Sequence, residues 1–298
     1  MYELIKDYKD NTSLRHSFNR LAEQTFGLNF EYWYETGYWR DKYIPYSMVW
    51  KGEVVANVSV NRTDFVWNGQ RKYFIQLGTV MTVEAHRNKG LIRRIMEEIG
   101  QDYGIGKESA IYPTDGWYLF ANDHVLDFYP KFGFVPAKEY QYEKDVVVTG
   151  PATIIHVPMH RPKDWAVLEQ ALAESKPVGA FEMVDDCDLI FFYVTQFMKD
   201  IVYYEPQTGA YVVADLEDGT LTLHQVIAKG QPDLDGIIEA FGAQVKHVVL
   251  AFTPTDTAGY ERVLWKEEDC TLFVQGSGLQ EFEQSYLRFP RCLMHKPT

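Results

Sequence analysis

The chain has 298 residues, 46% hydrophobic and 24% charged, which is the composition of an ordinary folded protein with one large or two medium domains. Its formal net charge of −13 argues against a nucleic-acid partner, because binding phosphates requires clustered Lys and Arg. The three cysteines share no CxxC spacing, so neither a disulfide framework nor a zinc site is predicted. The first residues do not read as a signal peptide and no apolar run is long enough to span a bilayer, so we expect a cytoplasmic protein with no membrane partner.

The negative charge is concentrated in the second half of the chain. Residues 1–150 hold 18 basic and 20 acidic residues, and the remainder holds 11 basic and 22 acidic residues. Such a surface would attract a cationic substrate, but it would equally keep the protein soluble. The aromatic content of 15% is also high, which fits aromatic-lined pockets or a bulky core.

The first elements alternate between helix and hairpin signals. Apolar residues at helical spacing predict an amphipathic helix over residues 12–26, followed by a short helix over residues 30–35. Gly52 and the Asn68-Gly69 pair mark two hairpin turns, because both positions favour positive φ. A long apolar strand is expected over residues 72–83.

A polar loop over residues 84–89 follows that strand. The remaining elements of the first half are a helix, a short strand, a second helix and a pair of strands, at residues 90–103, 109–112, 123–131, and 134–140 with 143–148. Gly150-Pro151 marks a plausible domain boundary. We therefore expect one domain over residues 1–149 and another over residues 150–298.

The second half repeats part of this order. A helix, a hairpin, a helix, a buried strand and a closing hairpin are predicted at residues 187–203, 210–214 with 221–227, 233–241, 245–252, and 262–265 with 271–275. The same succession in both halves predicts a diverged second copy of one fold.

The most informative segment joins the long strand to the helix at residues 90–103. Its turn is basic and contains Gly90, and the free backbone amides at a helix N-terminus converge where the helix dipole is positive. A pyrophosphate fits such a turn, with Arg87 and Lys89 supplying countercharge. The alternative is an ordinary connection with incidental charges. The phosphate-binding GxxxxGK[ST] loop is absent, and so is the dinucleotide fingerprint.

Two motifs in this half resemble those of the GNAT acetyltransferases. Residues 87–92 are similar to the family's R-x-x-G-x-G/A pyrophosphate loop, with Ile92 where Gly or Ala is usual. Residues 122–134 are similar to its N-x-x-A-x-x-F-Y-x-K-x-G-F segment, with Asn122 and Tyr129 seven apart and Val125 in the Ala position. The resemblance covers roughly half the chain, which resembles the enhanced-intracellular-survival type of this family.

The resemblance implies both a fold and an activity. The fold is of the α/β (α+β) class, with a central mixed, mostly antiparallel sheet flanked by helices, followed by a second, degenerate GNAT-like domain. The activity is transfer of the acetyl group of acetyl-CoA to a primary amine of a small molecule or peptide, by direct attack and without a metal. A non-catalytic acyl-CoA-binding regulator, or transfer of another acyl group, is the alternative.

Residue roles follow from the same resemblance. Main-chain groups of the strand would pair with the pantetheine arm, and the turn would hold the pyrophosphate; these residues are Val80, Met81 and Thr82, and Arg87, Asn88, Lys89, Gly90, Leu91 and Ile92. Asn122 would contact the pantetheine arm. Tyr129 would protonate the departing thiolate, unless it is only a core aromatic residue.

The general base is left open. Four acidic or basic side chains flank the motif loops, each more often a surface residue than a base: Glu84, His86, Asp115 and His124. In survival-type relatives the terminal carboxylate can reach the active site, and the apolar tail at residues 287–298 permits the same here. The second half has no R-x-x-G loop, so we expect it to bind no CoA and to wall off the acceptor site or serve in assembly. The acceptor amine, which the acidic charge would favour as a cation, and the oligomeric state are not specified by the sequence.

Overall fold

The computed structural model describes residues 1–106 and 110–290, which form two compact units that interleave in the sequence. The described part of the first unit is residues 1–63, 72–106, 110–137 and 267–281. The described part of the second unit is residues 64–71, 138–266 and 282–290. No helix among the described residues is long and apolar enough to cross a membrane.

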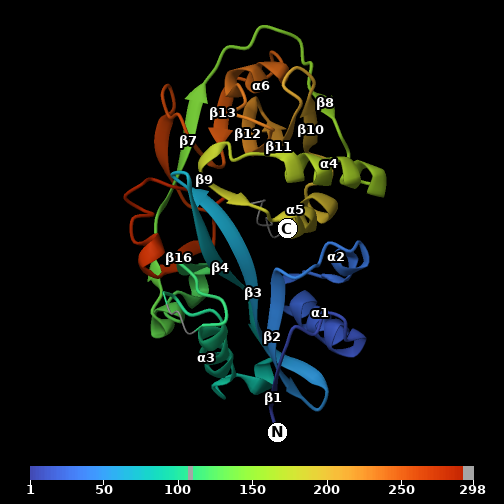
Figure 1. The fold of residues 1–298 in the computed structure, drawn as a ribbon, viewed down its shortest axis with the longest axis vertical. Helices are drawn as coiled ribbons and strands as arrows, with labels where there is room; N and C mark the ends of the chain where they lie inside the picture. The colour runs from blue at the N-terminus through green and yellow to red at the C-terminus, as the bar shows by residue number, and fades with distance from the viewer. Residues whose placement is uncertain (107–109, 291–298) are drawn as a thin grey trace. The chain divides into compact units, whose positions relative to one another are not determined.

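The first unit is built on one twisted sheet (Figure 1). Its strand order is β1 (Glu3–Lys6), β2 (Tyr43–Trp50), β3 (Glu53–Trp67), β4 (Gln70–Thr82), β5 (Gly116–Ala121), β16 (Thr271–Gln275) and β6 (Val135–Pro136). β4 and β5 pair in parallel, whereas β1, β2 and β3 are antiparallel to their neighbours, as are β5, β16 and β6. The sheet is therefore mixed and mostly antiparallel, as predicted.

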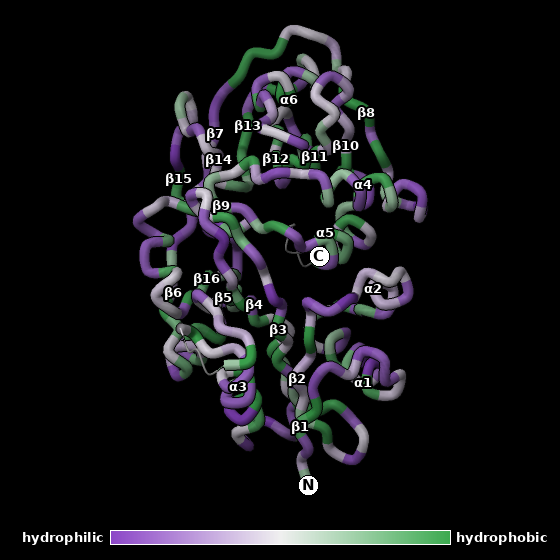
Figure 2. Tube along the Cα trace, in the orientation of Figure 1, coloured by the Kyte–Doolittle hydropathy of each residue, from purple (hydrophilic) through white to green (hydrophobic). Residues whose placement is uncertain are grey.

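The two faces of this sheet are covered by different helices, because successive side chains of a strand point to opposite faces. On β2, Tyr46 and Met48 join the core cluster beneath α3 (Leu91–Asp102). Tyr43, on the other face, stacks on Phe30 at the start of α2 (Glu31–Glu35), which packs with α1 (Thr12–Phe26). Figure 2 shows hydrophilic and hydrophobic colours alternating along α3, as expected of an amphipathic helix.

Several predicted boundaries in this unit are confirmed together with their physical cause. Asn11 caps α1 by accepting the Leu14 amide at 3.2 Å, and Gly27 ends the helix in the left-handed conformation. Asn68 and Gly69 both have positive φ, as the tight turn between β3 and β4 requires.

The second unit contains another sheet, which also has one parallel pair of strands among antiparallel ones. Its order is β15 (Glu261–Trp265), β7 (Glu139–Asp145), β13 (His247–Leu250), β12 (Thr220–Ile227), β11 (Ala210–Glu217), β10 (Val202–Glu205) and β8 (Ile155–His156). Only β12 and β13 pair in parallel. Its helices are α4 (Pro162–Glu174), α5 (Cys187–Gln196) and α6 (Leu234–Ala240). A further strand, β9 (Gly179–Val184), pairs with β14 (Thr253–Pro254) and with Asp64–Trp67 of β3. One parallel pair amid antiparallel strands in both sheets confirms the predicted second copy.

The predicted partners of four strands are wrong. The strands near residues 134–140 and 143–148 do not pair with each other, and those at residues 262–265 and 271–275 do not form a hairpin. Instead β16 lies between β5 and β6, while β7 lies between β13 and β15. Each half of the chain thus supplies one strand to the other half's sheet. Alternating hydrophobicity marks a strand but does not identify its partner, which is why the sequence pattern missed the exchange.

Two further elements differ from expectation. The helix predicted to reach residue 203 ends at Gln196, where the amides of Phe197 and Met198 both bond to the carbonyl of Tyr193. The short strand predicted at residues 109–112 is not formed over residues 110–112, and Ser109 lies outside the described residues.

Candidate active site

The candidate site begins where the two parallel strands of the first sheet separate. β4 and β5 pair from Phe74 with Gly116 to Leu77 with Leu119. Beyond that point β4 continues to Thr82 and β5 continues to Ala121 without pairing with each other, while β5 keeps β16 on its other edge. The main chain of Val80, Met81 and Thr82 therefore has no β5 partner, which is the splayed geometry expected of a strand that pairs with an extended ligand.

A backbone irregularity marks the start of the separation. Thr79 has a φ of 44°, the left-handed region that a β-branched residue rarely adopts. Its conformation is held by two buried side chains: Asn57 donates from Nδ2 to the Thr79 carbonyl at 2.9 Å, and the Tyr43 hydroxyl bonds to Thr79 Oγ1. Strain of this kind persists only where the surroundings over-determine it, which is typical of functional sites.

The support of Thr79 extends into a polar network inside the sheet. Asn57 also donates to Ser59 Oγ at 2.9 Å and accepts from Ser47 Oγ at 2.8 Å. Ser47 bonds in turn to the hydroxyl of Tyr8 at 2.6 Å. Asn57, Ser59 and Ser47 have no exposed surface, so the centre of this hydrogen-bond network is fully desolvated. None of these residues was singled out by the sequence, in which they look like ordinary strand positions.

After β4 the chain makes one 3₁₀ turn, Glu84–His86, and then a tight turn into α3. Asn88 and Gly90 have positive φ, and a Cβ built on Gly90 would meet no atom within 4 Å. Within the described chain, the backbone amides of residues 88–93 have no acceptor, since the first helical bond runs from Arg94 to the Gly90 carbonyl. A row of free amides at a helix start with open space beside it can receive an anion.

Two exposed cations flank this turn. Arg87 Nε donates to the Thr82 carbonyl at 3.4 Å, and Lys89 Nζ donates to the Ala85 carbonyl at 2.8 Å. Leu91 is buried beneath the turn, and Ile92 packs against the same core cluster. Ile92 therefore has a packing role where the family pattern has a small residue.

Tyr129 lies against the aromatic part of the core. Its ring contacts Phe134 and, from β16, Phe273, with ring centroids 6.3 and 5.7 Å away. Burial raises the pKa of the Tyr129 phenol to about 12, so it stays protonated at neutral pH. The hydroxyl has no hydrogen-bond partner among the described residues. A protonated, uncommitted phenol can act as a proton donor.

The segment carrying Tyr129 is not the predicted helix. Residues 123–131 form two 3₁₀ turns, Asp123–Val125 and Tyr129–Phe132. Pro130 lacks the N–H that an α-helix would need at this position, which explains the interruption. The shortened turns are tied to the exchanged strand region: Asn122 Nδ2 donates to Asp269 Oδ2 at 3.1 Å, and the Asp123 amide donates to Asp269 Oδ1 at 2.9 Å.

The four side chains considered as bases occupy different environments. His86 is buried between Trp50 and Tyr2, whose hydroxyl bonds to its Nδ1 at 2.8 Å, and burial together with nearby Lys89 lowers its pKa. Asp115 accepts the Tyr73 amide next to the first β4–β5 pair, so it lies at the paired end of β5 and away from the split. Glu84 and His124 are exposed, and Thr298 with its carboxylate lies outside the described residues.

The described residues contain no group of three or more His, Cys, Asp or Glu side chains that could hold a metal ion. The candidate site thus has three parts: the separated ends of β4 and β5, the turn with free backbone amides before α3, and the buried side chain of Tyr129. Together with the sheet order, these define the GNAT fold, present here in a tandem arrangement.

Comparisons with known proteins agree with this fold. No family model and no curated protein matches the sequence. Among solved structures, a probable N-acyltransferase of unknown function from Enterococcus faecalis V583 has a TM-score of 0.60 at 16% identity, over 95% of this chain and 74% of its own. A GCN5-related N-acetyltransferase from Kribbella flavida has a TM-score of 0.53 at 15% identity, over 92% and 70%. Eis1 from Mycobacterium abscessus has a TM-score of 0.50 at 13% identity, over 91% and 73%.

Proposed function

We propose that the protein is an N-acetyltransferase that transfers the acetyl group of acetyl-CoA to a primary amine of a small molecule or peptide. The observation that carries this proposal is the end of β4, where main-chain groups without a β5 partner lead directly into the free amides at the head of α3. An extended pantetheine needs the first feature and a pyrophosphate needs the second. The similarity of the fold to several acetyltransferases supports the proposal.

The proposed cofactor contacts follow the chain. Main-chain groups of Val80, Met81 and Thr82 would pair with the pantetheine amides. The pyrophosphate would lie on the turn formed by Arg87, Asn88, Lys89, Gly90, Leu91 and Ile92, where the space beside Gly90 admits it. The amide of Asn122 is exposed and its Nδ2 is engaged by Asp269, which leaves the Asn122 Oδ1 atom for a donor on the pantetheine arm.

Bound acetyl-CoA supplies a thioester carbonyl that an amine can attack directly. A main-chain N–H of the β4 split is suited to donate to the carbonyl oxygen as negative charge develops there. Tyr129 is suited to donate its proton to the leaving sulfur, because its pKa of about 12 keeps the phenol protonated. The second unit binds no CoA in this proposal, and its acidity favours a cationic acceptor. In this proposal the catalytic domain is residues 1–149, which supply the cofactor contacts, and the second copy of the fold is residues 150–298.

The first test is isothermal titration with acetyl-CoA on the wild type and on the double variant Arg87→Ala/Lys89→Ala. Two charge-assisted contacts are removed, so we expect affinity to fall by about tenfold to a hundredfold. A matched control is Lys163→Ala/Lys199→Ala, which removes the same charge from two exposed residues of the second unit and should leave affinity unchanged. Wild-type protein that is folded yet does not bind acetyl-CoA would refute the proposal.

A turnover assay with a panel of amines separates the remaining alternatives. Binding without turnover on any amine favours an acyl-CoA-binding regulator. Faster turnover with a longer acyl-CoA favours transfer of another group. The free phenol of Tyr129, which a mere binding protein does not need, favours catalysis.

A further inference from the structure

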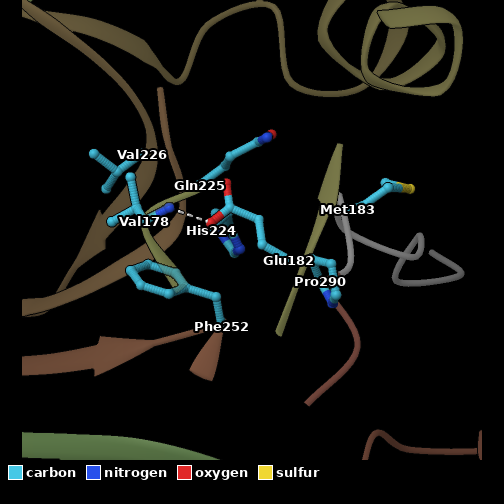
Figure 3. A pocket seen from close by; sticks show the side chains of 8 residues that line it. All are labelled: Val178, Glu182, Met183, His224, Gln225, Val226, Phe252 and Pro290. Carbon is cyan, nitrogen blue, oxygen red and sulfur yellow. Dashed lines mark hydrogen bonds between the residues drawn. The ribbon is translucent and has the colours of Figure 1, made fainter. Parts of the chain in front are cut away.

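The second unit contains a pocket of its own, whose lining side chains are drawn in Figure 3. It lies where the parallel strands β12 and β13 separate. β12 and β13 pair from Thr220 with His247 to Leu223 with Leu250, after which β12 continues to Ile227 paired with β11 but no longer with β13. The pocket is lined by His224 and Val226 of this free end and by Phe252 beyond β13. It thus occupies the position in the second sheet that the candidate active site occupies in the first.

His224 is turned into this position by an irregularity of β12. The pairing with β11 shifts between Val213 and Ala214, so His224 is the extra residue of a bulge, just as Thr79 marks the split in the first sheet. Its Nε2 lies 2.8 Å from Asp215 Oδ2. An Nε2–H donating to this carboxylate leaves the Nδ1 lone pair as an acceptor, and no described residue occupies it.

Glu182 of β9 is the second polar group on the pocket wall (Figure 3). Its Oε2 accepts the amides of Val178 and Gly179, both at 2.6 Å, which fixes the carboxylate in place. Its Oε1 bonds to nothing in the described part of the chain. Burial raises the pKa of Glu182 to about 7, so this carboxylate lacks the solvation or countercharge that would normally keep it ionised.

The chemistry around the pocket does not suit CoA or another anion. The cofactor turn of the first unit has no counterpart, because Lys229 is paired with Glu174 and the start of α6 is capped by Asp233. His224 and Glu182 offer two acceptors, Gln225 adds a neutral amide, and none of the lining residues is a lysine or arginine. The remaining wall includes apolar side chains such as Val178, Phe252 and Pro290.

We propose that this pocket binds the protonated amino group of a small aliphatic primary amine. The ammonium would donate one N–H to Glu182 Oε1 and one to His224 Nδ1, and its hydrocarbon chain would lie against Phe252 and Pro290. An ammonium has three donors and a full charge, which matches two acceptors in a poorly solvated site better than a neutral group does. The inference concerns the second unit alone and does not require acetyl transfer.

The test is a titration of the full chain with n-butylamine, at about pH 8 so that Glu182 is mostly ionised. Glu182→Gln should lower affinity by about tenfold or more, because it removes the charge of the acceptor. Its amide oxygen can still accept the amides of Val178 and Gly179, so the fold should be retained. Glu239→Gln, at an exposed position of α6, removes the same charge and should bind like the wild type.

Two further probes test whether binding requires both the charge and the N–H donors of the amine. n-Butanol has the same chain without charge, and tetramethylammonium has the charge without N–H donors; both should bind at least about tenfold more weakly than n-butylamine. Equal binding of n-butanol, equal binding by folded Glu182→Gln, or no saturable binding of n-butylamine to the wild type would each overturn the proposal. Acetyl-CoA titration on the same samples reports separately on the proposed activity.

Discussion

The ring of Tyr129 packs against aromatic side chains, whereas its hydroxyl has no partner among the described residues. This environment suits a general acid and predicts how kcat responds when the hydroxyl is removed. We expect Tyr129→Phe to lower kcat by about a hundredfold or more while leaving acetyl-CoA affinity near that of the wild type, because general-acid groups contribute about 10²–10⁴. Steady-state kinetics together with isothermal titration measure both quantities.

The pH profile gives a second check on the same residue. Since the pKa of Tyr129 is raised to about 12, the acid form persists through the neutral range, and Tyr129 should cause no loss of rate between about pH 7 and pH 10. A rate that falls with an apparent pKa near that of an ordinary phenol, and loses this limb in Tyr129→Phe, would show that the hydroxyl is not buried in this way.

Glu182 predicts a pH dependence of stability, whether or not its pocket binds an amine. Its pKa is raised from 4.5 to about 7, chiefly by burial, so the folded state holds a proton that the unfolded state releases. The stabilisation is complete below about pH 4.5 and is lost as pH rises through about 7, by at most about 3 kcal/mol. Urea unfolding at about pH 5 and pH 8 should show this loss in the wild type relative to Glu182→Gln. Parallel pH profiles of the two proteins would contradict it.

At the scale of elements, the positive φ of Thr79 links the fold to the proposed chemistry, because Thr79 lies where the free end of β4 begins. The Tyr43 hydroxyl bonds to Thr79, and the Tyr8 hydroxyl bonds to Ser47 at the far end of the same network. Tyr43→Phe and Tyr8→Phe should each cost about 1–2 kcal/mol of unfolding free energy, since each removes one buried hydrogen bond. Only Tyr43→Phe should also reduce kcat/KM, by about tenfold, because it loosens the strand end that positions the thioester.

Denaturant unfolding and steady-state kinetics on both variants measure these effects. Equal kinetic losses in Tyr43→Phe and Tyr8→Phe would mean that the network stabilises the sheet without positioning the site.

The elements that the sequence predicted well are those with local causes. The helix over residues 12–26, the Asn68-Gly69 turn and the amphipathic α3 each depend on a few neighbouring residues. The turn from β4 into α3 was visible for the same reason. The support of Thr79 by Asn57 and Tyr43 was not, because contacts across strands leave no periodic mark in the sequence.

At the scale of the whole molecule, the exchange of strands was equally hidden. Nothing in the hydrophobic alternation of residues 139–145 or 271–275 states which sheet each strand will join. The same exchange brings Phe273 against Tyr129 and Asp269 against Asn122, so residues distant in sequence complete the candidate site. The strand and helix that flank the proposed cofactor turn were therefore predictable from the sequence, but the surroundings of Asn122 and Tyr129 were not.

The exchange also predicts how the chain responds to division. Residues 1–149 alone lack β16, which leaves one edge of β5 unpaired and β6 without its neighbour. Residues 150–298 alone lack β7, which separates β13 from β15. Exposed strand edges promote aggregation, so each half produced alone should be insoluble or poorly folded. Produced together, the two halves should co-purify, because each carries the strand that the other requires.

The measurement is size-exclusion chromatography and circular dichroism of each half and of the co-expressed pair. In the intact chain, one strand of each sheet is contributed by the other half, so unfolding of either half of the chain would remove strands from both sheets. We therefore expect a single cooperative unfolding transition rather than two. A soluble, monomeric fragment of residues 1–149 with well-formed secondary structure would show that β16 is dispensable, and two separate transitions in the intact chain would show that the exchange does not couple the units.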